Sequence, residues 1–156
     1  MGIRANFDFN EIDRYIEDKT KILDTLILRN LNYLGMQCVL IAKTLDTYQD
    51  QTANLRNSIG YVIVKNGTII ESVFEGKAKG NAVSDKSGEE VGKSYAQEIA
   101  LKFPTGYALI VVAGMNYASY VEDVHGLAVL QPAKDFATSK AEGILKKLIE
   151  QMKRAK

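Results

Sequence analysis

Apolar residues recur at helical spacing through the first third of the chain, and no other pattern restricts the possible folds as strongly. Asp8, with Glu11 three positions later, makes a capping box that would begin the helix, and Asn10 is a competing cap. Polar residues take over near Thr47, so we predict one long amphipathic helix, with a bend most expected at Gly35 and its neighbouring asparagines. The apolar positions are Ile12, Tyr15, Ile16, Ile22, Leu23, Leu26, Leu31, Leu34, Cys38, Ile41, Ala42 and Leu45.

Two β-branched and aromatic runs follow, Ile59–Val64 and Thr68–Phe74, joined through Lys65-Asn66-Gly67. An Asn-Gly pair tolerates the positive φ angles that a tight type I′ turn requires. The sequence therefore predicts a β-hairpin here.

A third strand is predicted by the unbroken apolar run Tyr107–Ala113, which is short, β-branched at its centre and bounded by Gly106 and Gly114. Such a run is typical of a buried strand rather than of a helix. Residues Leu127–Leu130 could add another short strand.

Two more helices complete the predicted order of elements. Ser94 and Gln97 form a capping-box candidate for a short helix that Pro104 closes, and a last helix has Pro132 near its first turn. We predict a single α+β domain over residues 1–156, a small mostly antiparallel sheet with a β-hairpin, packed between the long N-terminal helix and the C-terminal helix. The apolar face of the last helix is Ala133, Phe136, Ala137, Ala141, Ile144, Leu145, Leu148, Ile149 and Met152.

The segment Glu75–Lys93 interrupts these patterns with four glycines, no aromatic residue and balanced charges. Ordering its backbone costs about 1–2 kcal/mol per residue, whereas Val83 and Val91 each return only about 2 kcal/mol on burial. We therefore expect a mobile loop at about residues 75–93 that lies within the domain. If the chain assembles with copies of itself, the residues of this loop expected to contact a neighbouring subunit are Lys77, Lys79, Gly80, Lys86, Gly88 and Gly92.

Composition excludes several functional classes. The chain has one cysteine, Cys38, which lies on the apolar stripe, so neither an internal disulfide nor a Cys-x-x-Cys motif is possible and buried packing is expected. No signal peptide or membrane-spanning run is present. The net charge of +1 argues against nucleic-acid affinity driven by bulk charge, although Lys140–Lys156 carries six basic and two acidic residues.

Only one segment resembles a reactive site. Glu122-Asp123-Val124-His125 places the single histidine beside two carboxylates, but adjacent residues point in different directions and a metal ion usually needs three converging ligands. The spaced glycines Gly76–Gly80 and Gly88–Gly92 lack the Gly-Lys-Ser/Thr ending of a phosphate loop. We expect no catalytic residue, no metal ion and no cofactor.

Three short motifs carry a resemblance to a known family. They are Thr52-Ala53-Asn54-Leu55-Arg56-Asn57-Ser58-Ile59 before the hairpin, Tyr117-Ala118-Ser119-Tyr120-Val121-Glu122 after the third strand, and Leu130-Gln131-Pro132-Ala133 at the last helix. In this order they resemble the tail-completion and head–tail connector proteins of long-tailed bacteriophages and prophages. Ala53 stands where that family usually has glycine, and Asp123–Gly126 replaces its usual aromatic-Gly-Thr. The matching positions are Thr52, Leu55, Arg56, Ser58, Tyr117, Ala118, Tyr120, Glu122, Leu130 and Pro132.

The resemblance implies a structural protein that is not an enzyme. It implies a homo-oligomeric ring, usually a hexamer, at the capsid–tail junction or the tail end, with phage tail-tube and connector proteins as partners. DNA would pass through the ring without sequence-specific binding. The protein would be made in the host cytoplasm, would not contact a membrane, and would end in the virion.

Three other functional classes stay open. A host-type small binding module would remain monomeric and bind a partner peptide. A hydrolase or nuclease would use Glu122 and His125, and a nucleic-acid binder would use the terminal lysines and lose affinity steeply with salt. Within the structural class, we hypothesise that Arg56 and Glu122 form an ion pair, inside one subunit or across a subunit interface.

Overall fold

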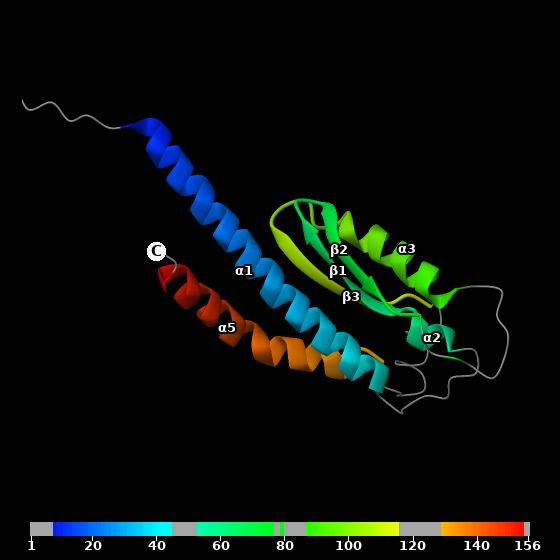
Figure 1. Cartoon of the computed structure of the whole chain (residues 1–156). Helices are drawn as coiled ribbons and strands as arrows, with labels where there is room; N and C mark the ends of the chain where they lie inside the picture. Colours follow the sequence, from blue (N-terminus) through cyan, green and yellow to red (C-terminus); the bar gives the residue numbers. More distant parts are fainter. Residues whose placement is uncertain (1–7, 45–52, 77–78, 80–86, 116–128, 155–156) are drawn as a thin grey trace, which may run out of the picture.

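The computed structural model describes residues 8–44, 53–76, 79, 87–115 and 129–154 (Figure 1). The three strands form an antiparallel sheet in the order β2-β1-β3. The predicted α+β class is confirmed. The elements are α1 (Phe9–Thr44), α2 (Asn54–Asn57), β1 (Ile59–Lys65), β2 (Thr68–Phe74), α3 (Gly88–Ala100), β3 (Tyr107–Ala113) and α5 (Gln131–Arg154).

Helices cover both faces of the sheet, but they are arranged differently from the prediction (Figure 1). The two long helices α1 and α5 lie side by side on one face, and α3 covers the other. The sheet is therefore packed between α1 and α3, and the expectation that α5 would cover its second face needs this correction. The reason is the stripe of small residues on α3, which lets that helix approach the sheet closely; the stripe is Gly88, Gly92, Ala96 and Ala100.

The central strand β1 is buried from Ile59 to Val64 because both of its faces are covered. Side chains alternate along a strand, so Ile59 contributes to the core beneath α1, while Val62 and Val64 contribute to the core beneath α3. Strand β3 continues both cores in the predicted Tyr107–Ala113 range. The two cores together hold the sheet between its helices.

The hairpin between β1 and β2 is confirmed, including its turn type. Asn66 and Gly67 have φ angles of 50° and 79°, the pair of positive values that a type I′ turn requires. Asn66 also links the turn to β3, because its backbone N–H donates to the Gly106 carbonyl at 2.9 Å and its side-chain oxygen accepts from the Gly106 N–H at 2.8 Å. The same turn therefore fixes two strand ends.

Helix α1 begins as predicted. Asp8 is its cap, since its Oδ1 accepts from the Asn10 N–H at 2.9 Å, and the competing cap Asn10 lies inside the helix. The helix runs without interruption through Gly35, where a bend was expected. A Cβ at Gly35 would lie 2.6 Å from the Tyr61 ring, so this glycine serves close packing of the helix on the sheet.

The predicted start of α3 is wrong. The helix begins at Gly88, where Ser87 is the cap and its hydroxyl accepts from the Glu90 N–H, six residues before the expected start at Ser94. The predicted loop at 75–93 is therefore too long, because its last six residues are helical. Glycine richness suggested a loop, but Gly88 and Gly92 are both buried on the packed face of the helix.

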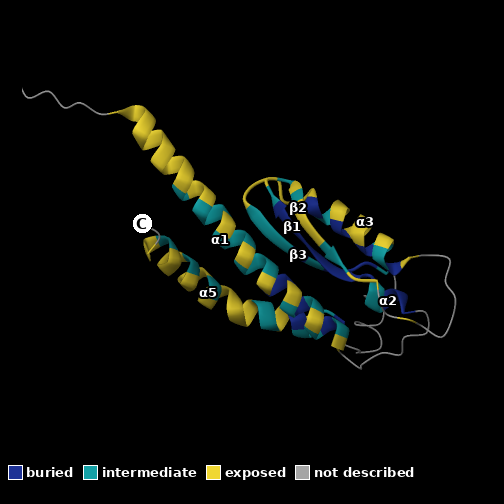
Figure 2. Ribbon diagram, in the orientation of Figure 1, coloured by how far each residue is buried: buried dark blue, intermediate teal, exposed yellow. Residues whose placement is uncertain are grey.

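At the start of α5, Val129 and Leu130 form a bend rather than the short strand suggested for Leu127–Leu130, of which 127 and 128 lie outside the described residues. Pro132 is in the first turn, as predicted. Only part of the predicted apolar face is covered: Ala133 is buried, whereas Leu145 and Ile149 near the other end are exposed (Figure 2).

Candidate assembly surface

The segment Asn54–Ser58 forms a tightly packed corner between α1 and β1. Leu55 is buried in the core beneath α1, and the fully buried Ser58 hydroxyl donates to the Leu55 carbonyl at 2.8 Å. The Ser58 carbonyl accepts from the Gly114 N–H at 3.3 Å, which ties the start of β1 to the end of β3. These two motif positions therefore build the fold and do not face solvent.

Helix α3 rests directly on this corner through its glycines. A Cβ at Gly88 would lie 2.2 Å from the Asn54 carbonyl oxygen, and one at Gly92 would lie 2.4 Å from the Ser58 carbonyl oxygen. Backbone atoms cannot move aside as the end of a side chain can, so only glycine fits at either position. We call Asn54–Ser58 together with Gly88 and Gly92 the glycine junction. The interface role predicted for these two glycines is thus replaced by a packing role.

Arg56 has a contact that the sequence did not reveal. Its guanidinium is half-buried, and Nη1 donates to the Lys43 carbonyl at the end of α1. The last carbonyls of a helix have no partner within the helix, so a cation there satisfies both hydrogen bonding and the helix dipole. Glu122 lies outside the described residues, and its pairing with Arg56 stays a prediction.

The remaining predicted site residues fall into two groups. Lys79 is exposed, while Leu130 and Pro132 are half-buried where α5 begins. The others lie outside the described residues: Thr52, Lys77, Gly80, Lys86, Tyr117, Ala118, Tyr120, Glu122 and His125.

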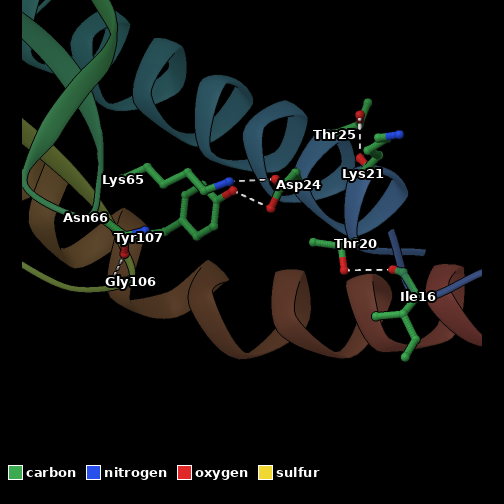
Figure 3. Close-up of polar contacts among 9 residues, drawn as sticks. All are labelled: Ile16, Thr20, Lys21, Asp24, Thr25, Lys65, Asn66, Gly106 and Tyr107. Carbon is green, nitrogen blue, oxygen red and sulfur yellow. Dashed lines mark hydrogen bonds and ion pairs between the residues drawn. The ribbon is translucent and has the colours of Figure 1, made fainter. Parts of the chain in front are cut away.

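A polar cluster fastens α1 to the hairpin end of the sheet (Figure 3). The Asp24 carboxylate accepts from Lys65 Nζ at 2.5 Å and from the Tyr107 hydroxyl at 2.6 Å, using one oxygen for each. Lys65 and Tyr107 are register partners on β1 and β3, so the two strands present both donors together. The cluster therefore joins three elements through one carboxylate.

Each member of this cluster has a shifted pKa. The hydrogen bond from Lys65, and then that from Tyr107, lowers the pKa of Asp24. The same bond to Asp24 raises the pKa of Lys65, while burial, followed by the bond to Asp24, raises the pKa of Tyr107. All three shifts favour the forms that bind one another, a carboxylate with an ammonium and a neutral phenol. The arrangement suits an anchor rather than a proton-transfer site.

The ends of α1 and α5 furthest from the glycine junction expose their apolar side chains (Figure 2). In α1, Phe9 is 74% exposed and Ile16 is 56% exposed, although their spacing continues the apolar stripe that packs further along the helix. In α5, Leu145 and Ile149 are 58% and 45% exposed. We call Phe9–Asp18 and Lys140–Arg154 the distal helix ends.

A groove of about 500 Å³ lies between α1 and the edge strand β2. Met36 and Leu40 of α1 line it and are more than half exposed, and Val73 of β2 adds a further apolar wall. Strand β2 pairs only with β1, and β3 only with β1, among the residues that the structure describes. Both outer strands thus present backbone groups that could receive another strand.

Other types of site find little support in the described ranges. There, no group of three or more His, Cys, Asp or Glu side chains could hold a metal ion, and no helix has the length and apolar character of a membrane span. Cys38 is buried as predicted, its thiol donates to the Ala133 carbonyl at 3.6 Å, and burial raises its pKa. A thiol in this state is a poor nucleophile.

Comparisons with known proteins do not assign this chain to a family. No family model, no curated protein and no solved structure matches the chain.

Proposed function

We propose that this protein is a structural component of phage assembly that forms a ring at the capsid–tail junction or the tail end. The order of the three short motifs along the chain carries this proposal. Two of the motifs have described residues that meet in the core beneath α1, since Leu55 shares that core with Ala133. This contact supports the view that these two motifs belong to one structural unit, whereas the motif at residues 117–122 lies outside the described residues.

Exposed apolar surface gives the proposal its second support. A subunit that functions alone has no need of a half-exposed apolar stripe at the distal helix ends, together with two edge strands that each pair only with β1 in the described part of the chain. A ring would cover such surfaces with identical neighbours. In this proposal the ring, a hexamer, joins tail-tube and connector proteins, lets DNA pass, and carries no catalytic group or cofactor.

The decisive experiment combines assembly with phage production. The purified protein is examined by light scattering and negative-stain microscopy over a concentration series, with and without phage tail tubes. We expect rings at high concentration or on tail ends, and unjoined heads and tails when the gene is deleted from an active prophage. A strictly monomeric particle in the presence of tail tubes, with normal virions after deletion, would contradict the proposal.

The loop offers a more specific test. If residues 77–86 make contacts between subunits, replacing them with a short Gly-Ser turn leaves the domain folded but abolishes ring formation or tail attachment. The replacement stops before Ser87 because Gly88 and Gly92 belong to the glycine junction. Thermal unfolding and ring counts are the two measurements, and normal rings from the shortened protein would show that the loop has no assembly role.

A peptide-binding module is the second candidate, favoured by the groove between α1 and β2. Its volume and apolar lining would suit a few large side chains of an extended peptide that also pairs with the edge of β2. The two functions differ in oligomeric state, because a binding module would remain monomeric while it bound its peptide.

A further inference from the structure

Helices α1 and α5 run antiparallel, and α1 extends well beyond the end of its partner (Figure 1). Their register is set where the Cys38 thiol donates to the Ala133 carbonyl. Because both helices rise equally per residue, Arg154 lies opposite about residue 17 of α1, which leaves roughly 12 Å of α1 projecting past α5. Four exposed apolar side chains of α1 lie on this projection, namely Phe9, Ile12, Tyr15 and Ile16.

The two distal helix ends carry opposite charge. Residues 9–18 contain four acidic side chains and one basic side chain, whereas residues 140–154 contain five basic and two acidic side chains. The helix dipole explains acids at the start of α1 and bases at the end of α5. It does not explain why Phe9, Ile12 and Ile16 on one end, and Leu145 and Ile149 on the other, are exposed between those charges.

The exposed stripe of α5 is distinct from the side that packs inside the chain. Ile144 packs against the core beneath α1, and Leu145 and Ile149 lie about one-third of a turn away from it around the helix. Lys146 and Lys153 border this exposed stripe, and Asp13 and Glu17 border the stripe on α1 by the same helical spacing. Each stripe also has one neighbour of the other sign, since Glu142 pairs with Lys146 at 2.6 Å and Lys19 lies three positions after Ile16. The excess charge beside the apolar strip is therefore negative on α1 and positive on α5.

We propose that the distal end of α1 packs against the distal end of α5 of a second copy of this chain. The acidic border of one stripe would meet the basic border of the other, and the apolar strips would be buried between them. Such a contact uses different surfaces on the two partners, so it can repeat from copy to copy and close into a ring. The inference rests on the proposed ring and names one contact that would hold it.

Charge reversal tests this contact in the full-length protein. Asp13→Lys with Glu17→Lys, and separately Lys146→Glu with Lys153→Glu, should each weaken self-association by roughly tenfold or more, as like charges come together. Mixing the two variants should restore association, because each then meets an opposite charge. Glu98→Lys, an exposed change on α3 across the sheet, is the matched control and should associate as the original protein does.

Cross-linking identifies which helices meet. Ile16→Cys and Ile149→Cys are placed in separate copies and mixed under mild oxidation, and the buried Cys38 does not compete. We expect a mixed disulfide-linked dimer. Products linking two Ile16→Cys copies only, reversal variants that associate normally, or a monomer at every concentration would each overturn the contact.

The same measurements separate this contact from the proposed function. If rings still form in both charge-reversal variants, the proposed contact is wrong and the proposed ring function is unaffected. If dimers form that depend on both sets of charges, but no rings form in the presence of tail tubes, the contact is supported and the ring function is contradicted.

Discussion

The glycine junction and the distal helix ends differ in how completely the chain buries them. At the junction, backbone of α3 lies against backbone of α2 with no room for one methyl group. At the distal ends, six large apolar side chains are between 43% and 74% exposed. Substitutions at the glycine junction should therefore change the stability of the fold, while those at the distal helix ends should change self-association.

The largest expected effect comes from filling the junction. Gly88→Ala with Gly92→Ala should destabilise the fold by about 2–6 kcal/mol, since overpacking costs about 1–3 kcal/mol at each site. Denaturant unfolding followed by circular dichroism measures it. The matched control is Gly143→Ala in α5, where an added Cβ would have no heavy atom within 4 Å. The free energy of unfolding of that control should rise by about 0.5–1 kcal/mol, because alanine has a higher helix propensity than glycine. A similar rise in the double variant would contradict the close packing at the glycine junction.

The second-largest loss of stability is expected on substitution of Arg56, because this residue links the glycine junction to the end of α1. Arg56→Ala should lose about 1–2 kcal/mol of unfolding free energy, as the Lys43 carbonyl loses a charged donor in a half-buried position. Arg56→Lys keeps the charge but not the planar guanidinium, so it should recover only part of that loss. An unchanged free energy of unfolding in Arg56→Ala would show that the contact does not stabilise the fold.

An ion pair between Arg56 and Glu122 would increase the loss of unfolding free energy caused by Arg56→Ala. Breaking a partly buried ion pair costs about 3–5 kcal/mol because a lone charge remains. A double-mutant cycle of Arg56→Ala and Glu122→Ala, scored on stability and on assembly, separates the two contributions. Additive effects in both assays would exclude the pair.

The sequence predicted elements whose signals are local. The Asn66-Gly67 turn, the apolar run of β3 and the spacing of α1 each depend on residues close together in the chain, and all three are confirmed. The start of α3 was missed although Ser87 and Glu90 have the capping spacing. In the sequence prediction, glycine counted only as a flexible residue. Glycine is required at Gly88 and Gly92 because the backbone of Asn54 and Ser58, more than thirty residues earlier in the chain, lies against them.

The candidate surfaces were less predictable, since they depend on distant parts of the chain. Asp24 meets residues 41 and 83 positions away, and Arg56 donates to a backbone carbonyl at the end of α1, 13 positions earlier. Exposure of the α1 stripe follows from the relative lengths of α1 and α5 and from their register, whereas Leu145 and Ile149 are exposed because they lie on another side of α5 than Ile144. A signal was available in the opposite charges of the two helix ends, which the sequence shows directly.

The Asp24 cluster should have a smaller effect, with a characteristic dependence on pH. The lowered Asp24 pKa means that its stabilisation is present above the ordinary carboxyl value of 3.8 and is lost as pH falls through the lower folded-state value. The raised Lys65 pKa means that stabilisation is present below 10.5 and is lost as pH rises through the higher folded-state value. Asp24→Asn should therefore lower Tm by a constant amount between about pH 5 and 9, with the difference shrinking outside that window. A difference that varied within the window would point to another titrating group.

The smallest effect on folding is expected at the distal end of α1, where the effect on association should be complete. Phe9→Ser with Ile12→Ser removes side chains that are 74% and 43% exposed, so the free energy of unfolding should change by about 0.5 kcal/mol or less. Self-association should be lost, because these residues supply much of the apolar strip of the proposed contact. Leu101→Ser at the end of α3 removes an apolar side chain that is 78% exposed and serves as the matched control, with normal association expected. Sedimentation velocity gives the oligomeric state and thermal unfolding gives the stability of each variant. If Phe9→Ser with Ile12→Ser unfolds far more easily but still associates, the distal end belongs to the folded core, and the contrast with the glycine junction fails.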